Sequence, residues 1–311
     1  MPTRPQHGVV GRRTISREMP LRDFALLAFV CLIWACHNII SKFVVAGMEV
    51  PPLFYAAVRF MLVGAIAAPW LLPLPRPLWR PALVAFFMGG GGFALYFLGI
   101  RTAMPSSAAI VAQLALPMTA VLSVTLLGER ISRRRLAGIV LTFVGVIIVM
   151  IEPGGVSVSR GLLFVAGSAL VGALGAVMMK QVEGVRPLQF QALAGATSIL
   201  PLSVLSLAVE QDQLGAALAA GWPFLAALLF SVVLVSLVSH SLYYHLIARH
   251  DANLIAPLML MMPLMTVALG VLITGDRLTV NVAAGSATAL LGVLVITRRE
   301  RGAARAPEAG A

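Results

Sequence analysis

The chain has 311 residues, of which 59% are hydrophobic and 11% are charged, and its mean hydropathy is +0.95. A soluble domain carries about 25% charged residues, so this composition excludes a soluble globular protein. The formal net charge of +11 would suit a nucleic-acid-binding protein, but the positions of the basic residues exclude that function. They gather at the tails and at one set of ends of the apolar segments.

Ten apolar segments follow one another along the chain, and a helix of about 20 residues is long enough to cross roughly 30 Å of hydrocarbon. The sequence therefore predicts an all-α polytopic membrane protein with ten transmembrane helices. The predicted spans are residues 24–45, 52–72, 81–100, 105–127, 136–151, 161–182, 188–209, 222–247, 252–274 and 278–296. The fifth span is short and can lengthen toward Arg135 or Glu152.

The basic residues divide unequally between the two sides of the predicted membrane. With the N-terminus inside, 18 of the 23 lysines and arginines fall in cytoplasmic segments, and only Arg101, Arg160 and Arg277 fall in outer loops. This asymmetry predicts that both termini are cytoplasmic in an inner (plasma) membrane protein. We expect a tail at 1–21, repeats at 22–152 and 153–297, and a tail at 298–311. The expected partners are the lipid bilayer and a small-molecule substrate, with no nucleic acid.

An internal duplication organises the chain. Gly128-Glu129-Arg130 recurs as Gly275-Asp276-Arg277, 147 positions later, and at that offset 10 of the 37 residues from 113 to 149 are identical to their partners. Five spans lie in each half, so the odd number turns the second half upside down. Two inverted five-helix repeats are typical of transporters that work by alternating access. A receptor or a membrane enzyme has no need of this symmetry.

The ionisable residues inside the spans are few. Carboxylates occur only in loops, tails or span ends, which disfavours a carboxylate-driven antiporter and a cavity for a bare cation. In the first span Trp34, Asn38 and Lys42 share one helical face, with His37 one step away. Lys42 and Arg59 either hold a substrate carboxylate, or else snorkel outward or cap carbonyls at helix ends. Trp34 and Asn38 serve either a substrate or interhelical packing.

Other pathway candidates lie in the later spans. His240 and Tyr243 end the eighth span, and Tyr96 occupies the position equivalent to Tyr243 in the inverted half. Gln113 lies in the fourth span with no loop within reach, and Met262 belongs to a methionine-rich stretch. These side chains line a cavity or, on the alternative interpretation, pack as ordinary core residues.

Two sets of residues are predicted to have structural or gating roles. Pro117, Pro257 and Pro263 break backbone hydrogen bonds inside spans, which is tolerated where backbone lines a cavity or is buried in protein. The duplicated loops are predicted to end helices and fix the span that follows. The four glycines at 89–92 favour close helix packing or a hinge over a phosphate-binding loop.

Neither catalytic nor metal-binding spacing is visible. Cys31 and Cys36 lie five positions apart, so on a helix they point away from each other, and we expect neither a metal nor a cofactor. We therefore predict that the protein is not an enzyme. A membrane enzyme or receptor remains the alternative of a different class.

These residues resemble the EamA family of the drug/metabolite transporter superfamily. In the first half the resemblance rests on Trp34, Asn38, Lys42, Arg59-Phe60 and the loop at 128–130, and in the second half on 256–258, Pro263 and the loop at 275–277. Two residues depart from the family pattern: Asp276 replaces the commoner Glu, and His37 stands where a small residue is usual. The resemblance implies an exporter of small amphipathic metabolites, with amino acids or their derivatives as the expected substrates. The alternative, a multidrug or quaternary-ammonium exporter, usually has a buried acid.

Overall fold

The computed structural model describes residues 19–128, 131–151, 159–182, 184–250, 255 and 257–297. Regular structure in these residues is helical, which confirms the predicted all-α class. Elements labelled η are 3₁₀ or π-helical segments. The first half contains α1 (Leu21–Lys42), η1 (Phe43–Gly47), α2 (Pro52–Ala67), η2 (Ala68–Trp70), α3 (Trp79–Phe86), η3 (Phe87–Gly91), α4 (Gly92–Thr102), α5 (Pro105–Val111), η4 (Ala112–Leu114), α6 (Ala115–Leu127) and α7 (Arg133–Met150).

The second half repeats this order. It contains α8 (Arg160–Met179), α9 (Pro187–Val209), α10 (Gln213–Leu229), η5 (Phe230–Ser239), α11 (His240–Arg249), α13 (Met261–Leu269), η6 (Gly270–Thr274) and α14 (Val280–Thr297). Several elements join end to end into longer helices, so we number the membrane spans 1 to 10 in chain order.

Eight helical segments among the described residues are long and apolar enough to cross a membrane. They are Leu21–Gly47, Pro52–Trp70, Trp79–Thr102, Pro105–Leu127, Arg160–Met179, Pro187–Val209, Gln213–Tyr243 and Val280–Thr297. The shorter apolar helix Met261–Thr274 and α7 supply spans 9 and 5. Large apolar side chains point away from the bundle, with Leu207 76% and Leu272 81% exposed. The protein is therefore a multi-pass membrane protein with the predicted ten spans.

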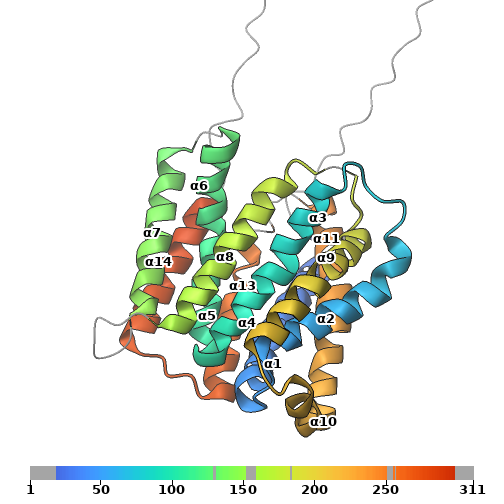
Figure 1. Ribbon diagram of the computed structural model, residues 1–311. Coiled ribbons are helices and arrows are strands. Elements are labelled where there is room, and N and C mark those ends of the chain that lie inside the picture. Colours follow the sequence, from blue (N-terminus) through green and yellow to red (C-terminus); the bar gives the residue numbers. More distant parts are fainter. Residues whose placement is uncertain are drawn as a thin grey trace, which may run out of the picture.

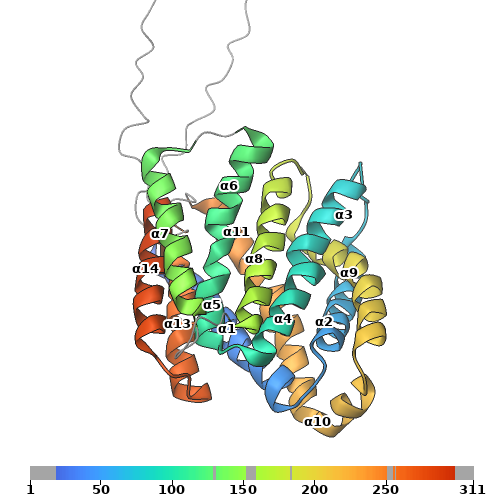
Figure 2. The same ribbon diagram turned by 60° about the vertical axis from the view of Figure 1, so that its left-hand side comes forward.

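The packing of the spans reflects the duplication. α7 pairs with α14 at one edge of the bundle and α2 pairs with α9 at the other, so spans 5 and 10, and spans 2 and 7, meet across the repeats (Figures 1 and 2). Between these edges α1 packs on α13 as α8 packs on α6. The C-terminal end of α6 and the turn before α14 lie at opposite ends of the bundle (Figure 2). Spans 1, 3, 4, 6, 8 and 9 thus form the middle of the molecule.

The contact between α7 and α14 depends on duplicated glycines. A Cβ on Gly145 would stand 2.3 Å from the backbone nitrogen of Ala289, and one on Gly292 would stand 2.5 Å from the backbone nitrogen of Thr142. Only glycine allows two helix backbones to approach this closely. These two glycines occupy equivalent positions in the two repeats, so one sequence feature builds both sides of the contact.

Four of the central spans are interrupted at positions that the offset of 147 relates. Span 3 contains the π-helical segment η3, where Gly89 leaves helical geometry with φ −101° and ψ −113°, and span 8 contains the π-helical segment η5. Span 4 has the 3₁₀ turn η4 shortly before Pro117, and span 9 has a turn at residues 259–260 shortly before Pro263. Breaks in a membrane helix are tolerated where protein or a cavity satisfies the backbone.

Two predicted boundaries shift for local reasons. α7 begins at Arg133 because Ser132 accepts a hydrogen bond from the backbone nitrogen of Arg135 at 3.3 Å, which caps the helix and lengthens the short fifth span. The helical run before span 8 begins at Gln213, but Gly221 has φ 58° and ψ −140° and divides it. The predicted start of span 8 at residue 222 coincides with this kink.

The glycines of the two duplicated loops lie at helix ends. Gly128 (φ 68°) and Gly275 (φ 67°) adopt the left-handed conformation at the C-termini of α6 and η6, where glycine carries no steric penalty. Glu129 and Arg130 lie outside the described residues, as does Ala256. The predicted roles of Glu129 and Arg130 therefore stay predictions.

Candidate functional site

A buried arginine is the central polar feature of the membrane region. Arg59 on α2 is 1% exposed, and its Nη1 lies 3.1 Å from Nε2 of His37 on α1. Its Nη2 donates to Oγ of Ser236 in η5 at 3.1 Å. The guanidinium carbon lies 4.1 Å from the centroid of the Phe93 ring. Spans 1, 2, 3 and 8 therefore converge on one guanidinium, and Arg59 does not snorkel to the membrane surface.

The hydrogen bond from Arg59 sets the state of His37. A guanidinium has only donors, so Nε2 of His37 accepts and carries a lone pair. The proton of the neutral ring then lies on Nδ1, which is 3.3 Å from Oγ of Ser41. His37 is 4% exposed and also contacts the rings of Phe93 and Phe97. A neutral histidine therefore accepts a hydrogen bond from the arginine and holds it in place.

A cavity of about 180 Å³ opens in front of Arg59. Trp34 lies on its wall, with ring centroids 5.1 Å from His240 and 5.4 Å from Tyr243. We refer to this space as the arginine cavity. Its walls come from spans 1, 2, 3, 7 and 8, and the lining residues are Trp34, Arg59, Phe60, Met88, Gly89, Phe93, Phe190, Gln191, Ala194, Ser236, His240 and Tyr243.

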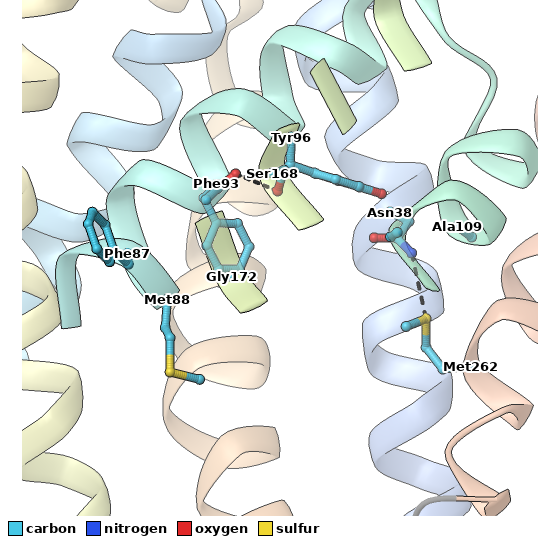
Figure 3. A pocket seen from close by; sticks show the side chains of 11 residues that line it. Asn38, Phe87, Met88, Phe93, Tyr96, Ala109, Ser168, Gly172 and Met262 are labelled. Carbon is cyan, nitrogen blue, oxygen red and sulfur yellow. Dashed lines mark hydrogen bonds between the residues drawn. The ribbon is translucent and has the colours of Figure 1, made fainter. Parts of the chain in front are cut away.

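A second cavity of about 220 Å³ adjoins the first, because Met88 and Phe93 line both. We refer to it as the apolar cavity. Figure 3 shows the Tyr96 hydroxyl directed across it toward Asn38. Its walls come from spans 1, 3, 4, 6 and 9, and the lining residues are Asn38, Phe87, Met88, Gly92, Phe93, Tyr96, Ala109, Ala112, Ser168, Gly172 and Met262.

Polar contacts around the apolar cavity join the two repeats. Asn38 Nδ2 donates to Oγ1 of Thr266 at 3.2 Å and lies 3.9 Å from Sδ of Met262 (Figure 3). Ser168 donates to the carbonyl oxygen of Gly92 at 2.7 Å, so the second repeat satisfies backbone next to the break in span 3. The Tyr96 hydroxyl is buried and has no hydrogen-bond partner. The cavity is thus apolar with one amide and one unsatisfied hydroxyl.

Lys42 occupies a different place from Arg59. Its Nζ donates to the carbonyl oxygens of Arg101 at 3.2 Å and Ala103 at 2.9 Å, at the C-terminal end of α4. A cation at this end satisfies orphan carbonyls and the helix dipole. Lys42 is among the lining residues of neither cavity, so its contacts match the predicted alternative of a carbonyl cap.

Two acids cap helices from the opposite repeat. Asp276 is 7% exposed and accepts from the backbone nitrogen of Ser106 at 2.9 Å, near the start of α5. Glu210 accepts from the backbone nitrogens of Leu53 at 2.8 Å and Phe54 at 2.9 Å, at the start of α2. Carboxylates are favoured at helix N-termini. The acid of the second duplicated loop, Asp276, therefore caps a helix and is not among the lining residues of either cavity.

The remaining candidates divide in the same way. The structure places Trp34, His240 and Tyr243 on the arginine cavity and Asn38, Tyr96 and Met262 on the apolar cavity, whereas Gln113 lies in η4 outside both linings. Arg277 lines a separate cavity of about 270 Å³ near the ends of α5 and α8. Pro257 and Pro263 lie beside the turn in span 9.

Sequence reasoning missed Phe93, Met88 and Ser236. Phe93 and Met88 line both cavities, and Ser236 holds Arg59. The available signal was position: Met88 and Phe93 flank the four glycines, and Ser236 precedes His240 by four residues on one helical face. Among the described residues, no group of three or more His, Cys, Asp or Glu side chains could hold a metal ion.

Inverted repeats, interrupted central spans and joined cavities at their interface define a membrane transporter. The chain belongs to the EamA-like transporter family, whose pattern it matches over residues 24–151 and 159–298. These two matches cover the two repeats of the fold.

Individual relatives agree with this assignment. A probable amino-acid metabolite efflux pump of Salmonella typhimurium is 27% identical over 288 residues, which cover 89% of this chain and 95% of the relative. The Escherichia coli protein of the same description is 26% identical and covers 84% of this chain and 90% of its own length. One crystal structure shares the fold with a TM-score of 0.60 at 20% identity, over 89% of this chain and 98% of the other.

Proposed function

We propose that the protein exports amino-acid derivatives from the cytoplasm across the inner (plasma) membrane by alternating access between its inverted repeats. The observation that carries the proposal is the pair of joined cavities, of about 220 and 180 Å³, between the repeats. A small metabolite of amphipathic character fits such a space, which combines apolar walls with a few fixed polar groups. The two relatives described as amino-acid metabolite efflux pumps support the substrate class.

The site does not favour export of organic cations. The charged side chain on the arginine cavity is Arg59, which repels a cation. Within the family the segments at 51–53, 59–63 and 256–258 resemble those of cysteine and O-acetylserine exporters. That resemblance and the cavities both favour amino-acid derivatives over organic cations as substrates.

Export is tested by profiling metabolites in the medium of cells that overexpress the protein. We expect the wild type to raise the medium concentration of amino-acid derivatives above the level with an empty vector. Phe93→Trp enlarges a side chain that lines both cavities, so it should abolish the rise at equal membrane level. Leu207→Trp, on the exposed surface, is the matched control and should export normally. The proposal would be refuted if cells with the wild type and cells with the empty vector gave the same medium concentrations of amino-acid derivatives.

The orientation rests on the unequal distribution of lysine and arginine. Reporter fusions at Ala311 should read inside, and fusions between Glu210 and Leu214 should read outside. A reading on the same side from both positions would contradict the inverted ten-span topology.

A further inference from the structure

Arg59 carries a buried positive charge without a carboxylate partner among the described residues. Its two hydrogen-bond acceptors, His37 and Ser236, are neutral, and its Nε is buried with no partner. A buried cation is costly unless an anion compensates it. Among the described carboxylates, Glu210 and Asp276 already accept hydrogen bonds from backbone nitrogens at helix N-termini. A bound anion can supply the counter-charge that the described residues do not provide.

The arginine cavity presents further donors beside this charge. Nε1 of Trp34 is buried and unpartnered, and an indole nitrogen can only donate. Gln191 adds a side-chain amide to the same lining. A carboxylate has two oxygens that accept several hydrogen bonds, and the planar guanidinium matches it in shape. The lining is thus built to accept an anion with paired oxygens.

The charge count restricts the anion to a single negative charge. Arg59 is the one Lys or Arg side chain among the described residues that line the arginine cavity. The lining histidine, His240, has its Nδ1 2.7 Å from the carbonyl oxygen of Val235 and adds no charge as a neutral imidazole. A dianion such as a phosphate monoester would leave one charge uncompensated in a site of low polarity. A monocarboxylate is neutralised completely.

The apolar cavity determines which chemical groups the ligand carries besides its carboxylate. The walls of this cavity are apolar and include Phe87, Met88, Ala109 and Ala112. The Tyr96 hydroxyl has no hydrogen-bond partner, so it favours a ligand with a neutral polar group at that point. A free ammonium group would need an anionic partner, and no Asp or Glu is among the described residues that line the two cavities. An acylated amine is neutral and still offers a carbonyl oxygen to that hydroxyl.

We propose that Arg59 is the carboxylate-binding residue of the transport site and that the substrate is an N-acylated apolar amino acid, which rests on the export function proposed above. The carboxylate lies against Arg59 and Trp34, and the apolar side chain extends past Phe93 into the apolar cavity. His37 and Ser236 are positioning residues, because they act through Arg59.

The test compares three ligands of one scaffold: N-acetyl-L-leucine, its uncharged amide N-acetyl-L-leucinamide, and zwitterionic L-leucine. Binding to the purified full-length protein is measured by calorimetry. We expect wild type to bind the acid at least about tenfold more tightly than the other two, since a charge-assisted hydrogen bond contributes about 1.5–3 kcal/mol. Arg59→Gln should lose this preference, and Arg59→Lys should recover only part of it because ammonium lacks the planar fork.

Arg160→Gln, at the exposed start of α8, is the control and should bind like wild type. If Arg59→Gln does not fold, Trp34→Phe provides the second measurement, because it removes a donor at similar shape and should weaken binding of the acid alone. The proposal is overturned if wild type does not bind the acid, if the amide binds as tightly, or if folded Arg59→Gln keeps the preference. Equal binding of L-leucine would refute the acylated amine and leave the carboxylate site.

The same variants separate this inference from the export function. Export of amino-acid derivatives that Arg59→Gln leaves unchanged would refute the carboxylate site and leave the function standing. Arginine-dependent binding of N-acetyl-L-leucine without any export by cells would refute the function and leave the site.

Discussion

At the scale of single residues, two basic side chains that look equivalent in the sequence have separate tasks. Lys42 and Arg59 are both cations inside apolar spans. Their partners decide the difference: backbone carbonyls at a helix end for Lys42, and neutral side chains beside a cavity for Arg59. The sequence left both roles open for each, because the partners of Lys42 are about 60 positions away and Ser236 is 177 positions from Arg59.

Lys42→Gln is expected to destabilise the protein without changing ligand affinity. The substitution removes two charge-assisted hydrogen bonds to the carbonyls of Arg101 and Ala103, a loss of about 1–3 kcal/mol. The thermal midpoint in detergent should fall, while the dissociation constant for N-acetyl-L-leucine stays within about twofold of wild type. A Lys42→Gln protein of normal stability that no longer binds the acid would instead place Lys42 in the binding site.

His37 is expected to act through the acceptor that it offers to Arg59. His37→Gln keeps an acceptor oxygen for Nη1 of Arg59, whereas His37→Leu removes it and leaves the donor unsatisfied. Calorimetry should show near-normal affinity for the acid in the first variant and a loss of about tenfold in the second. If both variants lose affinity equally, the imidazole contacts the ligand itself.

At the scale of elements, the breaks in the central spans were predictable only where proline or a run of glycine marks them. Pro117, Pro263 and the glycines at 89–92 mark spans 4, 9 and 3. The π-helical segment in span 8 has no such residue, since η5 reads FSVVLVSLVS. Its side chains bond backward across five positions, as in Ser236 to Ser231, and η5 packs against spans 1 and 2. Tertiary contacts of that kind leave no local signal.

The close crossing of α7 and α14 makes its glycines sensitive to one added methyl group. Gly145→Ala would place Cβ 2.3 Å from backbone of Ala289, which cannot move as a side-chain tip can. Overpacking of this kind typically costs about 1–3 kcal/mol, so the thermal midpoint should fall while ligand affinity is retained. Gly167→Ala is the control, because the atom nearest to its added Cβ would be Leu95 Cδ1 at 3.7 Å. Equal stability of both variants would show that the helices separate without cost.

At the scale of the whole molecule, most of the fold could be predicted from the internal duplication. The number of spans and their inversion follow from composition and the repeat. The fine asymmetry does not follow, because the two halves differ where the cavities form. Span 3 is sharply broken at Gly89 while the equivalent position in span 8, Ser236, stays helical and holds Arg59. The two repeats therefore present unlike surfaces to the cavities.

The charge of the proposed substrate determines what drives its export. No carboxylate lies at mid-span, and protonation of His37 at Nε2 would break its bond with Arg59 and place a second cation beside it, with His240 nearby. We therefore expect transport without a coupled proton. A monoanion leaving a cell that is negative inside gains about 2.3 kcal/mol per 100 mV, which is a concentration ratio of roughly 50.

In proteoliposomes, an imposed potassium diffusion potential should therefore accelerate efflux of N-acetyl-L-leucine. A pH gradient without a potential should leave the rate unchanged after subtraction of protein-free vesicles, which account for passive movement of the weak acid. Arg59→Gln should lose the response to potential together with binding. Accumulation driven by the pH gradient in wild type would contradict uncoupled transport. Loss of that accumulation in His37→Gln or His240→Gln would then identify the histidine that carries the proton.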